Sequence, residues 1–450
     1  MKKVFRNKLL SFTLALAIVF TLPASVFASA EISPWAEFDV SMAQTLYNLG
    51  DSGTYSNYGS VLTAAKFVPV YKTLAEANGL NFTFDSGSQA MTRGDVVNAL
   101  YEIISGSETV DAGAALDYFV AEKLLMGRAG NNYMLDENCT VEEMIVFALR
   151  AYEHLMYKAG EDTKGFFWEV QGNGNKVYLL GSVHFADAAM YPLSKAIVNG
   201  FNDAENLVVE VDVASQNDEL VAYTIIKGTY QNGETIQDYV TEETYKMYVE
   251  FSELIGLTEY DTYKPWFANN MVTAFAAATL DSGGAQTAEE IIPGMDMYLL
   301  YKALYAGKPI LELETADSQI DMFDSFSPEL QETLLNASLN AYFSAGEGDE
   351  EDSNLLQEAV QELIDVIKGG DDVEFSVYLN SLSESDEPEM EEYNYKLFTE
   401  RDSLMAEKII GYLKGGGDDY FVVVGAGHML GETGIVNVLK GKGYDVVRLK

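Results

Sequence analysis

Two short apolar runs, each ending in glycine and histidine, constrain the fold of this chain more than any other feature. Residues 177–184 read Val-Tyr-Leu-Leu-Gly-Ser-Val-His, and residues 420–428 read Tyr-Phe-Val-Val-Val-Gly-Ala-Gly-His. A short, uniformly apolar run bounded by glycine is typical of a strand buried inside an α/β sheet. Such sheets bind ligands beyond the carboxyl ends of their strands. Because the chain has only three histidines, two of them at strand ends predict a functional site that contains His184 and His428.

The residues around the first run predict one compact strand–helix–strand unit. Residues 166–180 hold two strand-like runs on either side of an Asn/Gly turn, which predicts a hairpin whose second strand leads to His184. A helix is expected after Pro192. Residues 206–212 then form another apolar run that carries Glu210 near its end. The unit has the size of a βαβ crossover and places a carboxylate at the end of a second strand.

Residues 31–160 are expected to form a separate, mostly helical domain. Thr92 is a candidate N-cap in front of apolar residues at helical spacing, and residues 114–125 form a second helical run. A third helix is expected from a capping box at Thr140 to about His154. We expect His154 to be a surface or capping histidine, because no metal-ligand spacing surrounds it.

The helical domain resembles the S-layer homology (SLH) module. Its helices start at Met91-Thr92-Arg93-Gly94-Asp95 and at Cys139-Thr140-Val141-Glu142-Glu143, which are similar to the T-R-A-E helix start of that module. The second start lacks the arginine, and the loop before it has Met134-Leu135-Asp136 in place of F-x-P. About one and a half units are recognisable, whereas wall-anchoring proteins usually carry three. The resemblance implies contact with a cell-wall polymer; the alternative is a helical accessory domain without polymer binding.

The first 30 residues have the pattern of a secretory signal peptide. A basic stretch at residues 2–8 precedes an apolar stretch at residues 9–22, and Ala28-Ser29-Ala30 supplies a cleavage site. No later stretch approaches about 18 apolar residues, so no transmembrane segment is expected after cleavage. Cys139 is the only cysteine, and exported proteins without disulfides are typical of a single-membrane envelope. We therefore expect a secreted or cell-surface bacterial protein; the alternative is an uncleaved membrane anchor.

The chain is strongly acidic, with a formal net charge of −42. This charge repels nucleic acid and anionic membranes and suits cationic partners or divalent metals, although it can equally serve solubility alone.

Residues 215–410 are expected to be predominantly helical. Within them, residues 345–354 and 383–392 are rich in acids, which predicts solvated loops, or calcium sites without EF-hand spacing. No H-E-x-x-H, G-x-S-x-G or phosphate-binding glycine loop is present in the sequence.

A series of short motifs between residues 165 and 450 resembles the TraB/PrgY/GumN family. The motifs occur in the family's order: Gly181-Ser182-Val183-His184, Tyr191-Pro192-Leu193, Val209-Glu210-Val211-Asp212, Pro293-Gly294-Met295-Asp296, Gly307 to Thr315, Glu400-Arg401-Asp402, Val424-Gly425-Ala426-Gly427-His428 and Gly441 to Val446. Asp402 stands where the family usually has asparagine. The resemblance implies an α/β fold related to erythromycin esterases and the ChaN proteins, with a central sheet and helical insertions.

The resemblance also implies a site and an activity. The family includes the TIKI proteins, which are metal-dependent proteases that require both G-x-x-H motifs and a glutamate. Carried over to this chain, the site consists of His184, Glu210 and His428, with Arg401 beside them. The family also includes proteins of bacterial pheromone shutdown, so activity is not implied for every member.

The chemistry of these residue types agrees with that site. Two imidazoles and one carboxylate form a usual ligand set for a catalytic divalent metal, with Mn, Co, Zn and Fe not distinguished. Such a metal activates water and polarises a carbonyl group, which drives hydrolysis. Asp212 and Asp296 are expected to support the ligands from outside; Asp212 lies two residues after Glu210 and hence on the same strand face. Arg401 is expected to stabilise an oxyanion or bind a peptide carboxylate, or else to form an ion pair on a helix.

Three hypotheses about function follow from the sequence. The first is a metal-dependent hydrolase that acts on a peptide or another small substrate. The second is a non-catalytic surface protein that binds or sequesters a peptide or small ligand without turnover. The third is a metal-free hydrolase in which a histidine is the general base, so that activity survives chelation.

Overall fold

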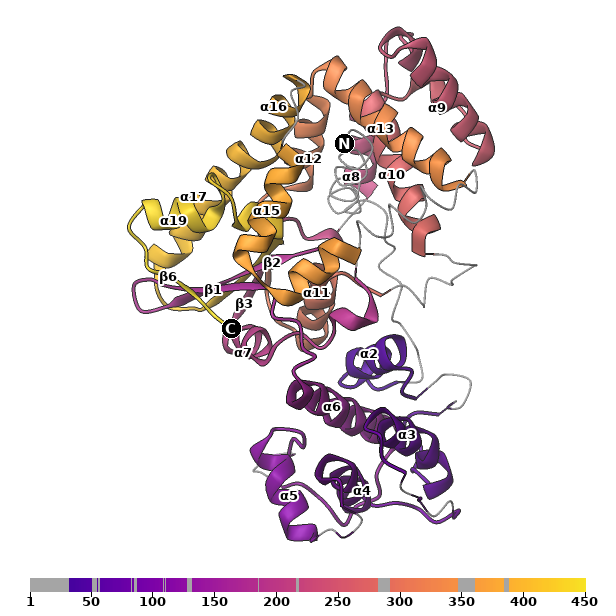
Figure 1. Cartoon of the computed structure of the whole chain (residues 1–450), viewed down its shortest axis with the longest axis vertical. Helices are drawn as coiled ribbons and strands as arrows, with labels where there is room; N and C mark the ends of the chain where they lie inside the picture. Colours follow the sequence, from indigo (N-terminus) through magenta and orange to yellow (C-terminus); the bar gives the residue numbers. More distant parts are fainter. Residues whose placement is uncertain are drawn as a thin grey trace.

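The computed structural model describes residues 32–50, 55, 57–81, 83–84, 87–107, 109, 111–127, 132–184, 186–215, 218–281, 292–346, 361–383 and 388–450. The expected signal peptide lies outside these residues, as do most of the first acidic stretch and part of the second. A helical N-terminal region is followed by a larger part built around a sheet (Figure 1). No helix in the described part of the chain is long and apolar enough to cross a membrane.

The N-terminal region contains α2 (Glu37–Tyr47), α3 (Ala64–Ala77), α4 (Arg93–Ser105), α5 (Ala112–Ala121) and α6 (Val141–Ala159). The helices α3, α4 and α6 each begin after a threonine whose hydroxyl accepts a backbone N–H bond. At Thr92 and Thr140 the reciprocal bond of a capping box is also present, from Asp95 and Glu143 respectively.

Three backbone hydrogen bonds close a ring at the start of these helices. Leu62 N donates to Cys139 O (2.8 Å), Met91 N to Leu62 O (3.0 Å), and Cys139 N to Met91 O (2.9 Å). The residues before the three helices are therefore linked cyclically, each donating to one neighbour and accepting from the other. The sequence analysis found only about one and a half units, because α3 has Lys66 where the other two helices have the acid that completes a capping box.

The larger part contains one six-stranded sheet of order β4-β3-β5-β2-β1-β6. Its strands are β1 (Phe166–Gln171), β2 (Lys176–Ser182), β3 (Asn206–Val209), β4 (Ile310–Glu312), β5 (Tyr420–Gly425) and β6 (Val446–Arg448). The expected hairpin is confirmed, since β1 and β2 pair antiparallel. The four strands β4, β3, β5 and β2 run parallel, and β6 pairs antiparallel with β1. The predicted α/β class is thereby confirmed.

Helices occupy most of the remaining described chain. They are α7 (Lys195–Asp203), α8 (Asp218–Gly228), α9 (Glu242–Leu254), α10 (Pro265–Asp281), α11 (Met295–Ala306), α12 (Ala316–Asp324), α13 (Pro328–Gly346), α15 (Asp372–Ser383), α16 (Pro388–Asn394), the π-helix η7 (Tyr395–Thr399), α17 (Glu400–Gly415), α18 (Ala426–Met429) and α19 (Ile435–Gly441). Residues 361–369 are helical as well. In Figure 1, α7 lies on one side of the sheet, whereas α17 and α19 lie on the other.

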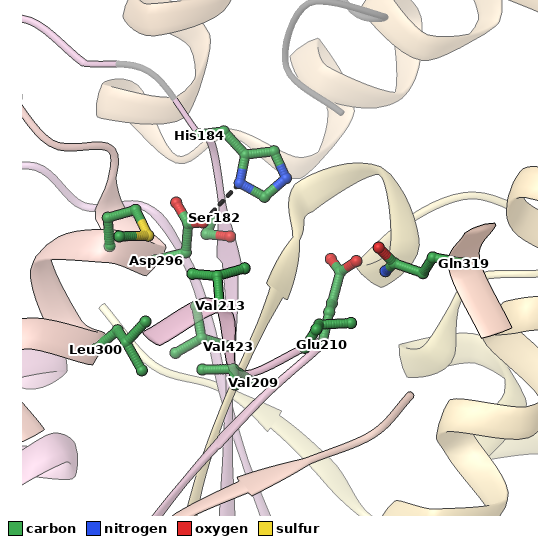
Figure 2. A pocket seen from close by; sticks show the side chains of 11 residues that line it. Ser182, His184, Val209, Glu210, Val213, Asp296, Leu300, Gln319 and Val423 are labelled. Carbon is green, nitrogen blue, oxygen red and sulfur yellow. Dashed lines mark hydrogen bonds and ion pairs between the residues drawn. The ribbon is translucent and has the colours of Figure 1, made fainter. Parts of the chain in front are cut away.

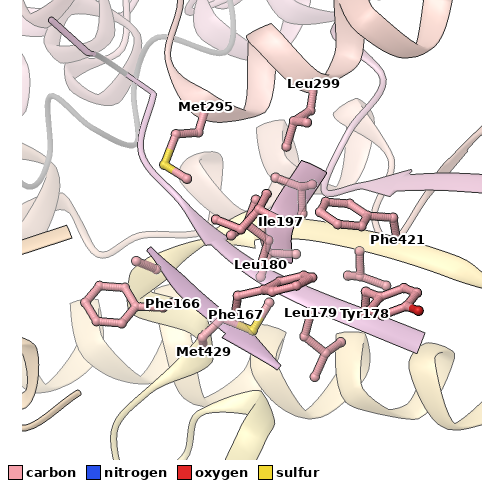
Figure 3. Packing of buried hydrophobic residues seen from close by; sticks show 14 of the residues in the cluster. Phe166, Phe167, Tyr178, Leu179, Leu180, Ile197, Met295, Leu299, Phe421 and Met429 are labelled. Carbon is pink, nitrogen blue, oxygen red and sulfur yellow. The ribbon is translucent and has the colours of Figure 1, made fainter. Parts of the chain in front are cut away.

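The main apolar core surrounds the middle of the sheet (Figure 3). Phe421 in β5 is fully buried, and its ring contacts those of Phe167 and Phe201 at centroid distances of 5.6 Å. Burying such a side chain contributes roughly 1.5–3 kcal/mol. The uniform apolarity of β5 and β2 thus reflects a sheet whose strands are covered on both faces.

The helix α2 belongs to two cores. Its residues Phe38, Met42 and Leu46 pack in the core of the sheet, where the Phe38 ring contacts that of Tyr298 at 5.2 Å. Val40 on the same helix packs in the core of the helical N-terminal region. The two parts are therefore joined through apolar contacts as well as through the chain.

Candidate functional site

Both histidines of the G-x-x-H motifs leave the sheet at the same edge. The strands β2 and β5 are parallel neighbours, and their register pairs Ser182 with Gly425. His184 and His428 follow these paired residues, and both line one hollow at this edge. The strand β3 is the other parallel neighbour of β5 and leads to Glu210. A Cβ atom on Gly425 would lie 3.4 Å from Glu210 Oε1 and 3.6 Å from His428 Cδ2, so Glu210 and His428 flank this glycine.

His428 is fully buried and is held from one side. Its Nδ1 lies 2.6 Å from Asp402 Oδ1, an atom supplied by α17. Burial raises the pKa of the Asp402 carboxyl, while His428 acts in the opposite direction. The other ring nitrogen, Nε2, is buried and has no hydrogen-bond partner among the described residues. The imidazole is thus oriented through Nδ1, which leaves Nε2 available to a ligand.

His184 is held in the same way by the first turn of α11. Its Nδ1 lies 2.6 Å from Asp296 Oδ2 (Figure 2). Gly294 permits this approach, because a Cβ atom there would lie 2.3 Å from the carbonyl carbon of His184. Burial alone would lower the pKa of His184, but the charges of Asp296 and Glu210 outweigh burial and raise it. Asp296 therefore has the supporting position that the sequence analysis expected.

Glu210 is anchored by Arg401 and by the backbone. Its Oε2 accepts from Arg401 Nη2 at 2.9 Å, and its Oε1 accepts from Gly425 N at 2.6 Å. Burial alone would raise the pKa of the Glu210 carboxyl, but His428, Arg401, His184 and the Gly425 N–H together lower it to about 2. Glu210 is therefore an ionised, fixed carboxylate in the site.

Arg401 is buried and also binds a second carboxylate. It donates from Nε and Nη2 to Glu314 at 2.7–3.0 Å, and from Nη1 to Leu397 O at 3.3 Å. The ion-pair alternative for Arg401 thus describes this structure, with Glu210 and Glu314 as its partners. The sequence analysis left Glu314 out of the site, although its place in the segment from Gly307 to Thr315 was a usable signal.

Two expectations about other residues are wrong. The strand β3 ends at Val209, so strand alternation does not extend to Asp212, whose Oδ1 accepts from Ala214 N. Asp296 and Asp402 hold the two histidines, and a supporting role of Asp212 in the site stays a prediction. His154 is 3% exposed rather than on the surface, because α6 is covered there and its Nε2 lies 2.7 Å from the hydroxyl of Tyr118.

Two hollows meet at His184. The larger has about 630 Å³ of empty space and contains the side chains of Glu210, Asp296 and Gln319 in its lining (Figure 2). The smaller, of about 370 Å³, is lined by both histidines. Ser182 lines both hollows, and its buried Oγ has no hydrogen-bond partner within the described ranges. The sequence analysis missed Ser182 as a site residue, although it belongs to the first G-x-x-H motif.

The donor set fits a divalent metal in its chemistry. Each histidine has Nδ1 next to a carboxylate, an arrangement that is typical of metal-binding imidazoles. Glu210 accepts two hydrogen bonds, whereas a carboxylate offers about four lone-pair sites. In this structure, however, no three His, Cys, Asp or Glu side chains of the described residues converge closely enough to hold a metal ion.

The chain is similar to proteins of one family. A model described as the TraB/PrgY/gumN family matches residues 166–448. The chain is 22% identical to Metalloprotease TIKI2 of Xenopus tropicalis over 64% of its own length and 60% of that protein. It is 27% identical to a Metalloprotease TIKI homolog of Nematostella vectensis, over 43% of its length and 42% of that protein. It is 26% identical to the protein YbaP of Escherichia coli (strain K12), over 37% and 61%. The chain thus spans less than two thirds of each relative, and no solved structure matches it.

Proposed function

Because the chain belongs to the TraB/PrgY/gumN family, we propose that it is a hydrolase whose substrate is a peptide. The observation that carries this proposal is the pair of carboxylate-held imidazoles at one sheet edge, with the ionised Glu210 beside them. Two relatives named as metalloproteases support the choice of a peptide bond. The substrate class is thus inferred from the geometry of the site together with the names of these relatives.

A divalent metal is part of the proposal. His184 and His428 would hold it through Nε2, and Glu210 would hold it through a remaining lone pair. When bound, such a metal lowers the pKa of a water molecule and polarises a carbonyl group. The sequence and the donor set do not distinguish Mn, Co, Zn and Fe.

The protein's own residues prepare the site. Asp296 and Asp402 accept from Nδ1–H of the two histidines, which directs the lone pair of each Nε2 away from its carboxylate. Arg401 fixes Glu210 and, with both Glu210 and Glu314 as partners, supplies positional support rather than an unpaired cation. In the metal-free variant of the same function, an Nε2 lone pair accepts a proton from the attacking water.

The metal is tested by mass spectrometry of protein purified without chelators or affinity tags. We expect near-stoichiometric metal in the wild type and its loss in the variant His184→Ala/His428→Ala. The matched control is His154→Ala, which removes the remaining histidine and should leave the metal content unchanged. Equal metal in all three proteins would contradict the proposed ligands.

Hydrolysis is tested with a peptide library in the presence and absence of a chelator. Cleavage that is lost on chelation and restored by added metal supports the metallohydrolase. Cleavage that survives chelation but requires the histidines supports the histidine general base. Capture of a peptide in a one-to-one ratio without turnover would overturn the enzyme proposal in favour of a binding protein.

Export to the bacterial cell surface and contact with a cell-wall polymer are further parts of the proposal. Residues 1–30 support export by their sequence pattern, and the ring of three equivalent helix starts supports the comparison with SLH modules. N-terminal sequencing of the secreted protein should find Glu31 first. Cosedimentation of the full chain with purified cell walls tests the polymer, and a protein that stays in the supernatant would contradict it.

A further inference from the structure

The smaller hollow differs from the larger one in the chemistry of its walls. Away from the two histidines and Ser182, its larger side chains are apolar: Leu363, Ile367, Phe375 and Phe398. The larger hollow instead exposes the carboxylates of Glu210 and Asp296. The two hollows meet at His184, so this proposed catalytic residue lies between an acidic hollow and an apolar one.

The apolar walls come from three separate segments of the chain. Leu363 and Ile367 are four residues apart in the helical segment 361–369, so they lie on the same helix face. Phe375 belongs to α15 and is fixed from behind by Phe166, at a ring-centroid distance of 4.7 Å. Phe398 belongs to η7 and completes the wall beside the catalytic histidine.

The hollow is continuous with the proposed catalytic groups. The ring of Phe398 lies 5.3 Å from the imidazole of His428, measured between centroids. Gly425 and Gly427 form the adjoining wall, where the absence of side chains leaves the backbone accessible. A group that enters this hollow therefore touches the residue that carries one of the two available Nε2 atoms.

We propose that the smaller hollow is a specificity subsite for one large apolar side chain of the substrate, next to the bond that is cleaved. This inference rests on the proposed function and adds the substrate class to it. Its empty space of about 370 Å³, which includes open solvent at the mouth, lies directly against these apolar side chains and His428. Removing one methylene from a side chain held in such a pocket lowers kcat/KM by roughly 10- to 200-fold.

The substrate preference is tested with paired variants of one helix. Ile367→Ala enlarges the hollow and should shift the peptide-library preference at the subsite position toward larger apolar side chains by at least about tenfold. Ile364→Ala is the matched control: Ile364 is buried in the same core but does not line the hollow. The control should lose comparable stability and keep the wild-type preference. An unchanged preference in Ile367→Ala overturns the inference.

A second measurement does not depend on hydrolysis. The chain has three histidines, so selective histidine labelling gives three imidazole signals in an NMR spectrum. Titrated indole should shift the His428 signal and leave that of His154 in place, and Ile367→Phe should abolish the shift by filling the hollow. No shift, or an equal shift in Ile367→Phe, overturns the subsite. A specific shift without any peptide cleavage supports the subsite and counts against the hydrolase alone.

Discussion

Replacing Arg401 by methionine should destabilise the protein strongly. The side chain is 8% exposed and pairs with two carboxylates whose own side chains are 11% and 10% exposed. Removing one partner of a buried ion pair costs about 3–5 kcal/mol, because the other charge stays buried without compensation. Methionine fills much of the same volume, so the loss reports the charge rather than a cavity.

The stability lost in Arg401→Met should depend on pH. The folded state lowers the pKa of Glu210 from 4.5 to about 2, which corresponds to about 3 kcal/mol of stability at neutral pH. A lowered carboxyl pKa stabilises the fold above about pH 4.5, and the contribution disappears as the pH falls through about 2. In Arg401→Met this pKa rises, so the difference between variant and wild type should be largest at pH 7 and shrink on acidification.

Thermal unfolding of chelator-treated protein, followed by circular dichroism between pH 7 and pH 3, measures both effects. For a chain of this size a shift of about 1–2 °C per kcal/mol predicts a melting temperature lowered by roughly 3–10 °C at pH 7. The control is Arg150→Met, whose ion pair with Asp39 is 27% exposed on both sides and is worth about 0–1 kcal/mol. If the melting temperature of Arg401→Met at pH 7 corresponds to a loss of less than about 1 kcal/mol in the free energy of unfolding, the argument from buried charge is refuted.

Three further changes test other parts of the structure. Burial raises the pKa of Glu153 to about 7; because a raised carboxyl pKa stabilises the fold at low pH and loses its contribution as the pH rises through 7, Glu153→Gln should raise the melting temperature at pH 8 and not at pH 4. The gain is at most about 3 kcal/mol, reduced by solvent around this half-buried side chain; equal gains at both pH values would contradict the assignment. Ser182→Ala should reduce peptide hydrolysis while leaving the melting temperature equal or higher, since it removes a buried hydroxyl without a partner, and a lowered melting temperature would indicate a structural role. Asp402→Asn should weaken metal binding by about 10- to 100-fold in a competition titration, because the carboxylate orients the His428 ring through Nδ1, and unchanged affinity would speak against this support.

The positions of the two histidines were predictable because they depend on local patterns. A strand buried on both faces must be apolar throughout, so β2 and β5 can be recognised in the sequence. The glycines at their ends indicate that each strand stops just before its histidine, His184 or His428. The motifs of the family resemblance then indicated Glu210 and Arg401.

The partners of these residues depend on packing between distant segments. Asp296, which was expected from the sequence but without its partner, reaches His184 across 112 residues of sequence; Glu314, which was not expected in the site, reaches Arg401 across 87. No periodicity encodes which of 70 acidic residues makes such a contact. Strand alternation could not place Asp212 either, because β3 already ends at Val209. The apolar hollow was equally hidden, because its walls come from segments that meet only in the folded chain.

The order of the strands has a consequence for how the protein reaches its native state. The strand β5 lies between β3 and β2, yet it is made long after both; its Gly425 contacts Glu210 from 215 residues away. Until β5 is inserted, nothing joins β2 to β3 in the sheet, and the contacts that Gly425 and His428 make in the site are missing. Pairing across such sequence separations is slow, because the chain loses the entropy of a long loop before the strand contacts stabilise it. A nascent or truncated chain that lacks β5 therefore has its hairpin but no assembled site, and activity should appear only in the last phase of folding.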